Sequence, residues 1–349
     1  MNDVPESYNE LKEISIVKWY GNSESAFALT FDDGFKAHYD YVFPILNKYG
    51  LRATFYVNSS FLVSKVGGKA INRYGYIEDF CEMSDAGNEI ASHSLTHPNL
   101  SELSSDKLIA ELYEDKNNIE KFTGRKCLTH AYPYCNHNKH VDDVASSCFI
   151  ACRQCGSIRN NYSVEYQKRF SINSKMLIWK YPRSLLNEKQ SFLELKDEID
   201  KISGGFGVVC MHETLPFSLL NTSDTYEIAT TEFLERLCCY LSVQWKTRRI
   251  WTAPFSDVLR YSIERDALQV RKNVISEDCI RYDFFSNLDS AVYNVPLTIG
   301  YAVESRYKKY YCIIKTQNNK IIRKIPLAGK KQLYLDIVPN RDIMLIVKF

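Results

Sequence analysis

The stretch that most constrains the fold is an apolar run followed directly by an acidic corner, Ala26-Phe27-Ala28-Leu29-Thr30-Phe31-Asp32-Asp33-Gly34. Apolar and β-branched residues bounded by a polar turn predict a buried strand that ends in two adjacent carboxylates. In α/β architectures, ligands and catalytic groups collect where strands end at their carboxyl side. We therefore expect Asp32 and Asp33 to lie at such a site.

Helices and strands are predicted to alternate after this corner. A helix over 37–48 closes at Gly50, a strand covers 52–57, and a long helix begins near Ser104 and ends at Gly124. Further segments are a helix over 79–86, strands over 127–134, 177–183, 207–213 and 249–252, and helices over 231–246 and 254–265. Helix and strand in repeated alternation indicate a parallel sheet.

Two histidines follow the strand that is predicted to start after Gly87. His93 and His97 are spaced i, i+4, which brings both imidazoles to one side of a helical or turn-like segment. Neighbouring carboxylates such as Asp32 and Asp33 both stay ionised only beside a cation or a basic group. Two histidines, one carboxylate and an open position are typical of a catalytic metal site, which leaves the other Asp free as a general base on water.

At these residues the chain resembles the polysaccharide deacetylases with a NodB-type catalytic domain (carbohydrate esterase family 4-like). Their first motif, Thr-Phe-Asp-Asp-Gly, is matched at Thr30–Gly34, and their second, His-Ser/Thr-x-x-His-Pro, at His93–Pro98. The resemblance implies a distorted (β/α) barrel and a divalent metal, usually zinc. Asp33, His93 and His97 would bind this metal, with Asp32 as the base.

The third motif of the family, commonly Arg-x-Pro-Tyr, falls on Ala131–Tyr134 in a Tyr-Pro-Tyr variant. The family pattern implies that the backbone amide of Tyr134 faces the reacting carbonyl as an oxyanion donor. Ala131 replaces the Arg, so the partner that tunes the base is missing. We consider Arg183, after a predicted strand, as the partner of Asp32; the alternative is a surface arginine after a proline.

A last strand-end histidine is His212, in Gly207-Val208-Val209-Cys210-Met211-His212. An amide hydrolase needs an acid opposite its base, because an amine leaves more readily once it is protonated. His212 matches the last motif of the family, where this histidine protonates the leaving nitrogen. Cys210 stands where the family often has Leu.

The chain is predicted to contain three parts: an extension over 1–24, a catalytic domain over 25–265, and a small β-sandwich over 266–349. The resemblance covers about residues 25–260. From about Asp266 the helical periodicity disappears. Strands are expected at 291–293, 297–299, 310–314, 321–322, 333–338 and 343–347, with a hairpin turn at Gln317–Lys320.

Nine Lys or Arg residues lie between Arg306 and Lys331 with no acidic residue among them. A surface formed by these residues could bind an anionic glycan, and the alternative is a solvated hairpin surface. For the chain as a whole, a formal charge of +2 argues against a dedicated nucleic-acid binder.

Composition also bears on the cellular environment. No run of about 18 apolar residues occurs, so no spanning helix is expected, and no secretory signal is visible, which suggests the cytoplasm unless a signal was removed. Eleven cysteines, most of them in apolar runs, favour reduced thiols over a disulfide framework. The spacing Cys148-x3-Cys152-x2-Cys155 is that of a radical-SAM cluster motif, but the apolar residues between Cys148 and Cys152 favour a strand interior.

The function predicted from these features is metal-dependent removal of acetyl groups from N-acetylated sugars, with a carbohydrate as the partner. The same motifs also allow O-acetyl esters or a small cyclic amide as substrates, since they specify hydrolysis and not the group released. A non-catalytic glycan-binding relative is the third possibility, and the intact set of Asp32, Asp33, His93, His97 and His212 argues against it.

Overall fold

The computed structural model describes residues 13–66, 68, 73–177, 188–222 and 228–348. The chain divides into two compact units. One is Ser25–Leu259, and the other combines the residues before Ser25 with those from Arg260 onward. The prediction from the sequence separates 1–24 from the C-terminal module, whereas the structure places the described residues of that extension in one unit with it.

The first unit is a closed barrel of parallel strands. The strands in order are β2 (Ser25–Phe31), β3 (Thr54–Val57), β4 (Glu89–Ser92), β5 (Thr129–Ala131), β6 (Ala151–Cys155), β8 (Ile172–Met176) and β9 (Phe206–Met211). The barrel closes because β9 pairs in parallel with β2, from Ala26↔Phe206 to Phe31↔Met211. This confirms the predicted distorted (β/α) barrel.

The distortion is visible at the other edge of β2. Its first residues pair with β12 (Ile250–Thr252), whereas only Thr30 and Phe31 pair with β3. A short strand, β7 (Arg159–Asn160), runs antiparallel to the start of β9. β12 and β3 therefore share one edge of β2 between them.

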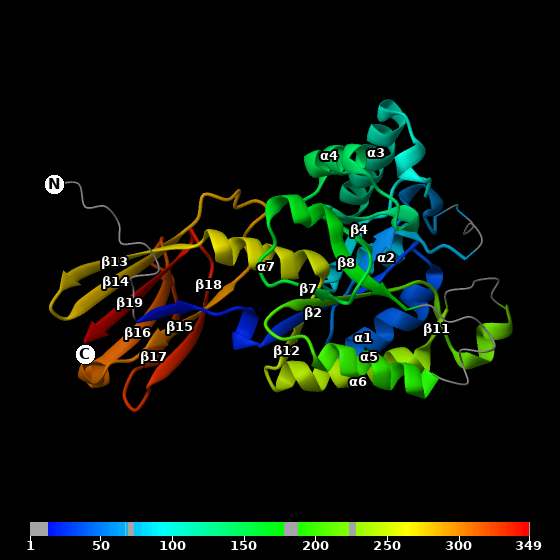
Figure 1. The fold of residues 1–349 in the computed structure, drawn as a ribbon. Helices are drawn as coiled ribbons and strands as arrows, with labels where there is room; N and C mark the ends of the chain where they lie inside the picture. Colours follow the sequence, from blue (N-terminus) through cyan, green and yellow to red (C-terminus); the bar gives the residue numbers. More distant parts are fainter. Residues whose placement is uncertain (1–12, 67, 69–72, 178–187, 223–227, 349) are drawn as a thin grey trace. The chain divides into compact units, whose positions relative to one another are not determined.

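Helices cover the outside of the barrel (Figure 1). They are α1 (Phe43–Tyr49), α2 (Ile77–Asp85), α3 (Ser105–Thr123), α4 (Lys139–Cys148), α5 (Glu188–Asp200) and α6 (Thr231–Lys246), and α7 (Phe255–Ala267) follows β12. α3 ends as predicted at Gly124, whose φ of 65° is a left-handed conformation that glycine adopts without steric cost. α6 begins at Thr230, whose hydroxyl accepts a hydrogen bond from the amide of Phe233.

Side chains of β2 alternate between the barrel interior and the helix layer. Phe27, Leu29 and Phe31 belong to the large apolar core that the helices cover. Ala26 and Ala28 therefore face the barrel interior, together with Thr30 and the following Asp32, because successive side chains of a strand point to opposite faces. The small alanine side chains leave interior space for larger polar groups.

The second unit contains two antiparallel sheets, as predicted for the C-terminal module. The three-stranded sheet has the order β1 (Ile14–Ile16), β15 (Leu297–Ala302) and β18 (Gln332–Ile337). The five-stranded sheet has the order β13 (Gln269–Ser276), β14 (Cys279–Phe285), β19 (Asp342–Lys348), β16 (Tyr310–Thr316) and β17 (Ile321–Pro326). The buried rings of Tyr282 and Tyr301, one from each sheet, lie 6.0 Å apart and join the two inner faces.

Two strand predictions from the sequence need comment. The run 291–293 is a turn and not a strand, because the carbonyl of Asp289 accepts from the amides of Val292 and Tyr293, and its carboxylate accepts from the amide of Ala291. Of the predicted strand 177–183, all but Leu177 lies outside the described residues. The strand at this point, β8, ends at Met176. No helix in the described ranges is long and apolar enough to cross a membrane.

Candidate active site

The predicted site residues gather at the carboxyl ends of the barrel strands. Asp32 and Asp33 follow β2, His93 follows β4, and His212 follows β9 by one residue. Asp33 and His97 have left-handed backbones, with φ of 76° and 58°. Positive φ at non-glycine residues is uncommon and concentrates at functional sites.

Asp33, His93 and His97 form a compact group of potential metal ligands. Oδ1 of Asp33 lies 3.6 Å from Nε2 of His93 and 3.5 Å from Nε2 of His97, and the two imidazole centroids are 4.9 Å apart. The ligand atoms of all three residues lie within 4.8 Å of one another. His93 is 2% exposed, whereas the side chains of Asp33 and His97 are partly exposed. The group is therefore open on one side.

The surroundings of His93 fix which nitrogen faces Asp33. Its Nδ1 lies 2.7 Å from the carbonyl oxygen of Ala131 and donates a hydrogen bond to it, which leaves the lone pair on Nε2. Burial lowers the pKa of His93 to about 4, so the ring is neutral at physiological pH. A neutral imidazole with a fixed tautomer, a second imidazole and a carboxylate are a donor set that fits a divalent metal such as zinc.

The second aspartate has a different environment. Asp32 is 3% exposed, and its Oδ2 accepts hydrogen bonds from Arg153 Nη2 and from Cys210 Sγ, the latter at 3.1 Å. Burial alone would raise the pKa of Asp32, but the positive charge of Arg153 beside it outweighs burial and holds this pKa well below its usual range. Oδ1 of Asp32 is buried and has no hydrogen-bond partner among the described residues.

The cationic partner of Asp32 is Arg153, which sequence reasoning missed. Arg153 lies in β6, is 1% exposed and also donates to the hydroxyl of Ser174 at 2.9 Å. Arg183, the predicted partner, lies outside the described residues. A charged residue inside the short strand Ala151–Cys155 was the available signal, since an arginine in a buried strand requires a buried partner.

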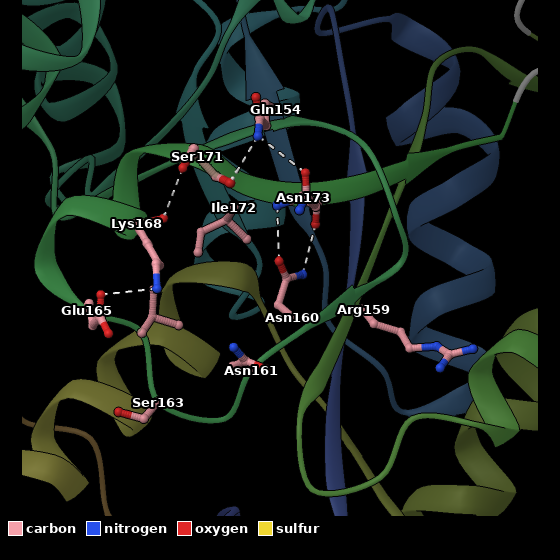
Figure 2. Close-up of a pocket in the computed structure, with 11 residues that line it drawn as sticks. Gln154, Arg159, Asn160, Asn161, Ser163, Glu165, Lys168, Ser171, Ile172 and Asn173 are labelled. Carbon is pink, nitrogen blue, oxygen red and sulfur yellow. Dashed lines mark hydrogen bonds and ion pairs between the residues drawn. The ribbon is translucent and has the colours of Figure 1, made fainter. Parts of the chain in front are cut away.

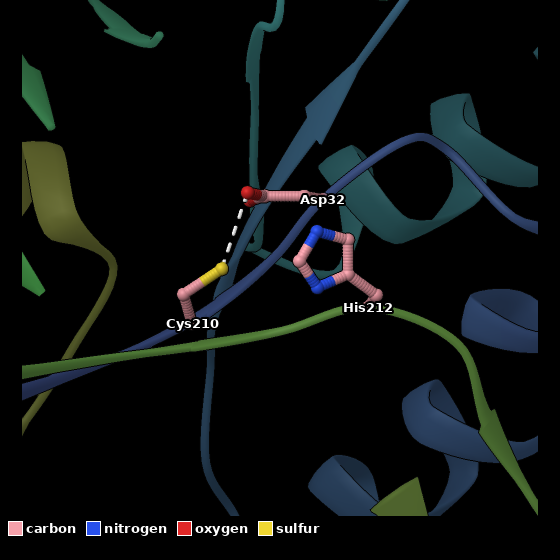
Figure 3. A group of neighbouring side chains, drawn as sticks. All are labelled: Asp32, Cys210 and His212. Atoms are coloured by element: carbon pink, nitrogen blue, oxygen red, sulfur yellow. Dashed lines mark hydrogen bonds between the residues drawn. The ribbon is translucent and has the colours of Figure 1, made fainter. Parts of the chain in front are cut away.

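His212 lies beside the carboxylate of Asp32, as Figure 3 shows. A ring nitrogen of His212, Sγ of Cys210 and a carboxylate oxygen of Asp32 are within 4.8 Å of one another. The backbone carbonyl of His212 lies 3.1 Å from Nε2 of His38, which is fully buried among aromatic rings. The structure thus brings the predicted base and the predicted acid close together.

The chemistry of this second group argues against a second metal. Burial raises the pKa of the Cys210 thiol well above its ordinary value, so the sulfur stays protonated and donates to Asp32. Arg153 already neutralises the carboxylate. Asp32, Cys210 and His212 therefore fit a hydrogen-bonded base and its neighbours better than a set of metal ligands.

Tyr134 lies at the rim of the site. Its ring contacts that of His97 edge-on, with centroids 4.6 Å apart, and its side chain is 64% exposed. Tyr134 and Cys135 both have left-handed backbones, with φ of 56° and 57°. Cys135 forms a disulfide with Cys155, which ties this turn to the end of β6.

The sequence favours reduced thiols over a disulfide framework, and the structure contains one disulfide. Nine cysteines are free, and five of them are buried. Of the three cysteines with the radical-SAM spacing, Cys148 ends α4, Cys152 is buried in β6, and Cys155 is bonded to Cys135. These three residues hold no iron-sulfur cluster in this arrangement, because Cys155 has no thiolate to offer.

A pocket elsewhere on the barrel is the main alternative location for a ligand. Its volume is about 420 Å³, and its lining is mostly polar: Gln154, Arg159, Asn160, Asn161, Ser163, Val164, Glu165, Lys168, Ser171, Ile172 and Asn173 (Figure 2). Asn160 and Asn173 hydrogen-bond to each other through side chain and backbone at 2.9 and 3.0 Å. No predicted catalytic or metal-binding residue lines it, so the strand-end cluster is the better candidate.

Comparison with known proteins agrees with this assignment. A family model described as polysaccharide deacetylase matches residues 20–151. This span includes the Asp-Asp-Gly corner, both predicted metal histidines and the Tyr134 turn. The peptidoglycan-N-acetylmuramic acid deacetylase PdaA of Bacillus subtilis is 31% identical over 126 residues, which are 36% of this chain and 44% of that protein.

Two further similarities extend over more of the chain. A gellan lyase of a Bacillus species is 23% identical over 344 residues, which are 96% of this chain but 13% of that protein. A solved structure, a mutant of a CE4 family pseudoenzyme with restored enzymatic activity, is 21% identical with a TM-score of 0.43 and covers 68% of each chain. The chain spans less than half the length of the two curated relatives.

Proposed function

Because this chain belongs to the polysaccharide deacetylase family, we propose that it is a metal-dependent hydrolase that removes acetyl groups from N-acetylated sugars of a poly- or oligosaccharide. The observation that carries the proposal is that its two adjacent aspartates have different neighbours. Asp33 faces two histidines, whereas Asp32 faces Arg153 and Cys210. One carboxylate is thereby available as a ligand and the other as a base.

Asp33, His93 and His97 would hold the divalent metal, and zinc suits this set of nitrogen and oxygen donors. The metal would supply Lewis acidity, which polarises a carbonyl group and lowers the pKa of water. The hydrogen bond from His93 Nδ1 to the carbonyl oxygen of Ala131 keeps Nε2, the nitrogen that would bind the metal, directed toward Asp33.

Asp32 would take a proton from the attacking water through Oδ1. Arg153 and Cys210 both donate to Oδ2, so Oδ1 is the oxygen left to accept a proton. Arg153 keeps the carboxylate ionised in a buried site, where burial alone would favour the neutral acid. A general base must be ionised before the reaction begins, and this environment provides that state.

His212 would give a proton to the departing nitrogen, and the amide of Tyr134 would stabilise the developing oxyanion. The position of His212 beside Asp32 supports the first role. The left-handed turn at Tyr134, next to His97, supports the second, because it lies at the edge of the ligand group. Base, acid and oxyanion donor would then all act on one reacting amide.

The substrate class rests on the family and on named relatives. Two relatives that match part of this chain, both from Bacillus subtilis, are named a putative polysaccharide deacetylase and a peptidoglycan-N-acetylmuramic acid deacetylase. We infer an N-acetylglucosamine-type glycan, because the base and acid arrangement suits an amide whose amine must be protonated before it leaves. An ester would not need the acid as strongly, because an alkoxide leaves without prior protonation far more readily than an amine anion does.

The direct test measures acetate release by the zinc-loaded protein from N-acetylhexosamine oligomers and from O-acetylated glycans, beside Asp32→Asn. We expect acetate from the N-acetyl substrates, and no acetate after chelation or in the variant. Release from O-acetyl substrates alone would contradict the amide specificity. No acetate from any substrate, with one metal bound, would indicate either a non-sugar amide as the substrate or a glycan-binding relative without catalysis.

A further inference from the structure

The β16–β17 hairpin and the segments beside it carry cations that have no carboxylate partner in the described part of the chain. These are Lys309, Lys315, Lys320, Arg323, Lys324, Lys330 and Lys331. No Asp or Glu occurs from Arg306 to Lys331. Six of the seven side chains are exposed, and that of Lys315 is half-buried.

Several lysines on other elements differ in this respect. Lys48 pairs with Glu235, Lys139 pairs with Asp143 at 2.9 Å, and Lys201 pairs with Asp197. An exposed group of cations without local counter-charges creates a positive potential that attracts anionic ligands. The hairpin is therefore a positive region in a chain whose formal charge is only +2.

The strand register places several of these groups on one face. On β16, Cys312 is buried and points into the sandwich, so Tyr311, Ile313 and Lys315 point outward. Lys324 of β17 lies opposite Ile313, and residues directly opposite share a face of the sheet. The outer face of the hairpin thus combines an aromatic ring with cations.

Two contacts hold these side chains over the sheet. Nζ of Lys324 lies 4.3 Å from the centroid of the Tyr311 ring, and Nζ of Lys315 donates to Oδ1 of Asn319 at 2.8 Å. Neither contact neutralises the charge. We define the cationic face as Tyr311, Lys315 and Lys324 of the two strands, together with Lys320, which immediately precedes β17.

We propose that the cationic face binds a polysaccharide that carries carboxylate groups. Lysine ammonium groups attract carboxylates as compact charges, and an aromatic ring on a strand pair offers apolar surface to a sugar ring. Both features are present within one hairpin. The proposal does not depend on the catalytic residues, because every residue of the cationic face lies in the second unit.

The geometry favours a polysaccharide over a membrane. Ile321 and Ile322 are exposed, at 60% and 50%, but they lie on the edge strand, and the turn before them is Gln317, Asn318 and Asn319. Polar amides would have to enter the lipid before the isoleucines. A surface helix or tip with apolar residues at its apex, as membrane-binding segments have, is therefore absent from this hairpin as the structure describes it.

The test measures binding by the full chain carrying Asp33→Ala, so that its outcome does not depend on acetate release. The probes are polygalacturonate, uncharged dextran, duplex DNA and phosphatidylserine vesicles, each at low and high salt. We expect binding to polygalacturonate that salt weakens, and no binding to dextran.

Two triple variants separate the cationic face from net charge. K315Q/K320Q/K324Q removes three unpaired lysines, and K48Q/K139Q/K201Q removes three ion-paired lysines with the same change in charge. We expect the first to weaken polygalacturonate binding by about tenfold or more and the second to leave it within about twofold. Tyr311→Ala, which changes no charge, is expected to weaken binding as well.

Three results would overturn the proposal. The first is no binding of polygalacturonate at low salt, and the second is equal weakening by both triple variants. The third is tighter binding of DNA or vesicles than of polygalacturonate, which would assign the cationic face to another class of polyanion.

Discussion

Arg153 donates a hydrogen bond to Oδ2 of Asp32, which precedes it by 121 residues, and both side chains are buried inside the barrel. Removing one partner of a buried ion pair leaves an uncompensated charge. We therefore predict that Arg153→Met lowers the free energy of unfolding by about 3–5 kcal/mol, measured by urea denaturation.

The matched control for this prediction is the double variant Arg153→Met with Asp32→Asn. Without the carboxylate no buried charge is left unpaired, so the double variant should recover much of the lost stability. Strictly additive losses in the two single variants would show that the pair does not interact as described.

Cys210 is predicted to position the carboxylate of Asp32 through its S–H group. Cys210→Ala should lower kcat by about fivefold, which corresponds to one hydrogen bond of about 1 kcal/mol, and should leave KM unchanged. Cys210→Ser keeps a donor at the same place and should restore most of kcat. A serine variant as slow as the alanine variant would contradict the role of the hydrogen bond.

His38 is predicted to position His212. It lies at the start of a π-helical turn, His38–Val42, and its Nε2 hydrogen-bonds to the backbone carbonyl of His212 at 3.1 Å. Burial lowers the pKa of His38 to about 4, so the ring is a neutral donor at physiological pH. His38→Leu should lower kcat by about tenfold with little change in KM.

His38→Gln is the control, because its amide nitrogen can donate to the same carbonyl. It should recover at least half of the lost activity at equal stability. Equal losses of kcat in both variants would mean that His38 acts only through packing against Phe31 and Phe55.

Asp115 of α3 predicts a pH dependence of stability. It is fully buried, Oδ1 accepts from the amide of Ser59 at 2.8 Å, and burial raises its pKa to about 7. Its pKa in the unfolded chain is about 3.9. Between these two values the folded state binds more protons than the unfolded state, so this group lowers stability as pH rises through that window.

Asp115→Asn should remove this contribution. The variant is expected to show a flatter free energy of unfolding between about pH 4 and pH 7 than the parent protein, measured by denaturant titration across that range. An unchanged pH profile would indicate that Asp115 is ionised in the folded protein.

Much of the barrel follows from local patterns in the sequence. The apolar run before Asp32, the end of α3 at Gly124 and the bounds of α6 each rest on neighbouring residues, and the structure agrees with them. The potential metal ligands were predicted for the same reason, because two histidines four residues apart and an Asp-Asp pair carry their own chemical signal, and the structure brings Asp33, His93 and His97 together.

Features that depend on distant pairing were not predictable. Arg153 contacts Asp32 only because both side chains point into the barrel interior. No local pattern in the sequence identifies Asp32 as the partner of Arg153. The disulfide joins Cys135 to Cys155, which are 20 residues apart. The sequence contains eleven cysteines, and nothing in it shows which two of them pair. β1 pairs with β15, where Ile14 lies opposite Tyr301, so the start of the chain completes a sheet formed by its end.

The central claim is that Asp33 is a metal ligand and the adjacent Asp32 is the general base. The most direct test is a zinc titration of the metal-free protein, followed by a measurement of acetate release from N-acetylhexosamine oligomers. We predict that Asp33→Ala loses both zinc binding and activity, whereas Asp32→Asn binds one zinc with nearly parental affinity and releases no acetate. Loss of zinc binding in Asp32→Asn, or retained zinc binding in Asp33→Ala, would contradict the assignment of ligand and base.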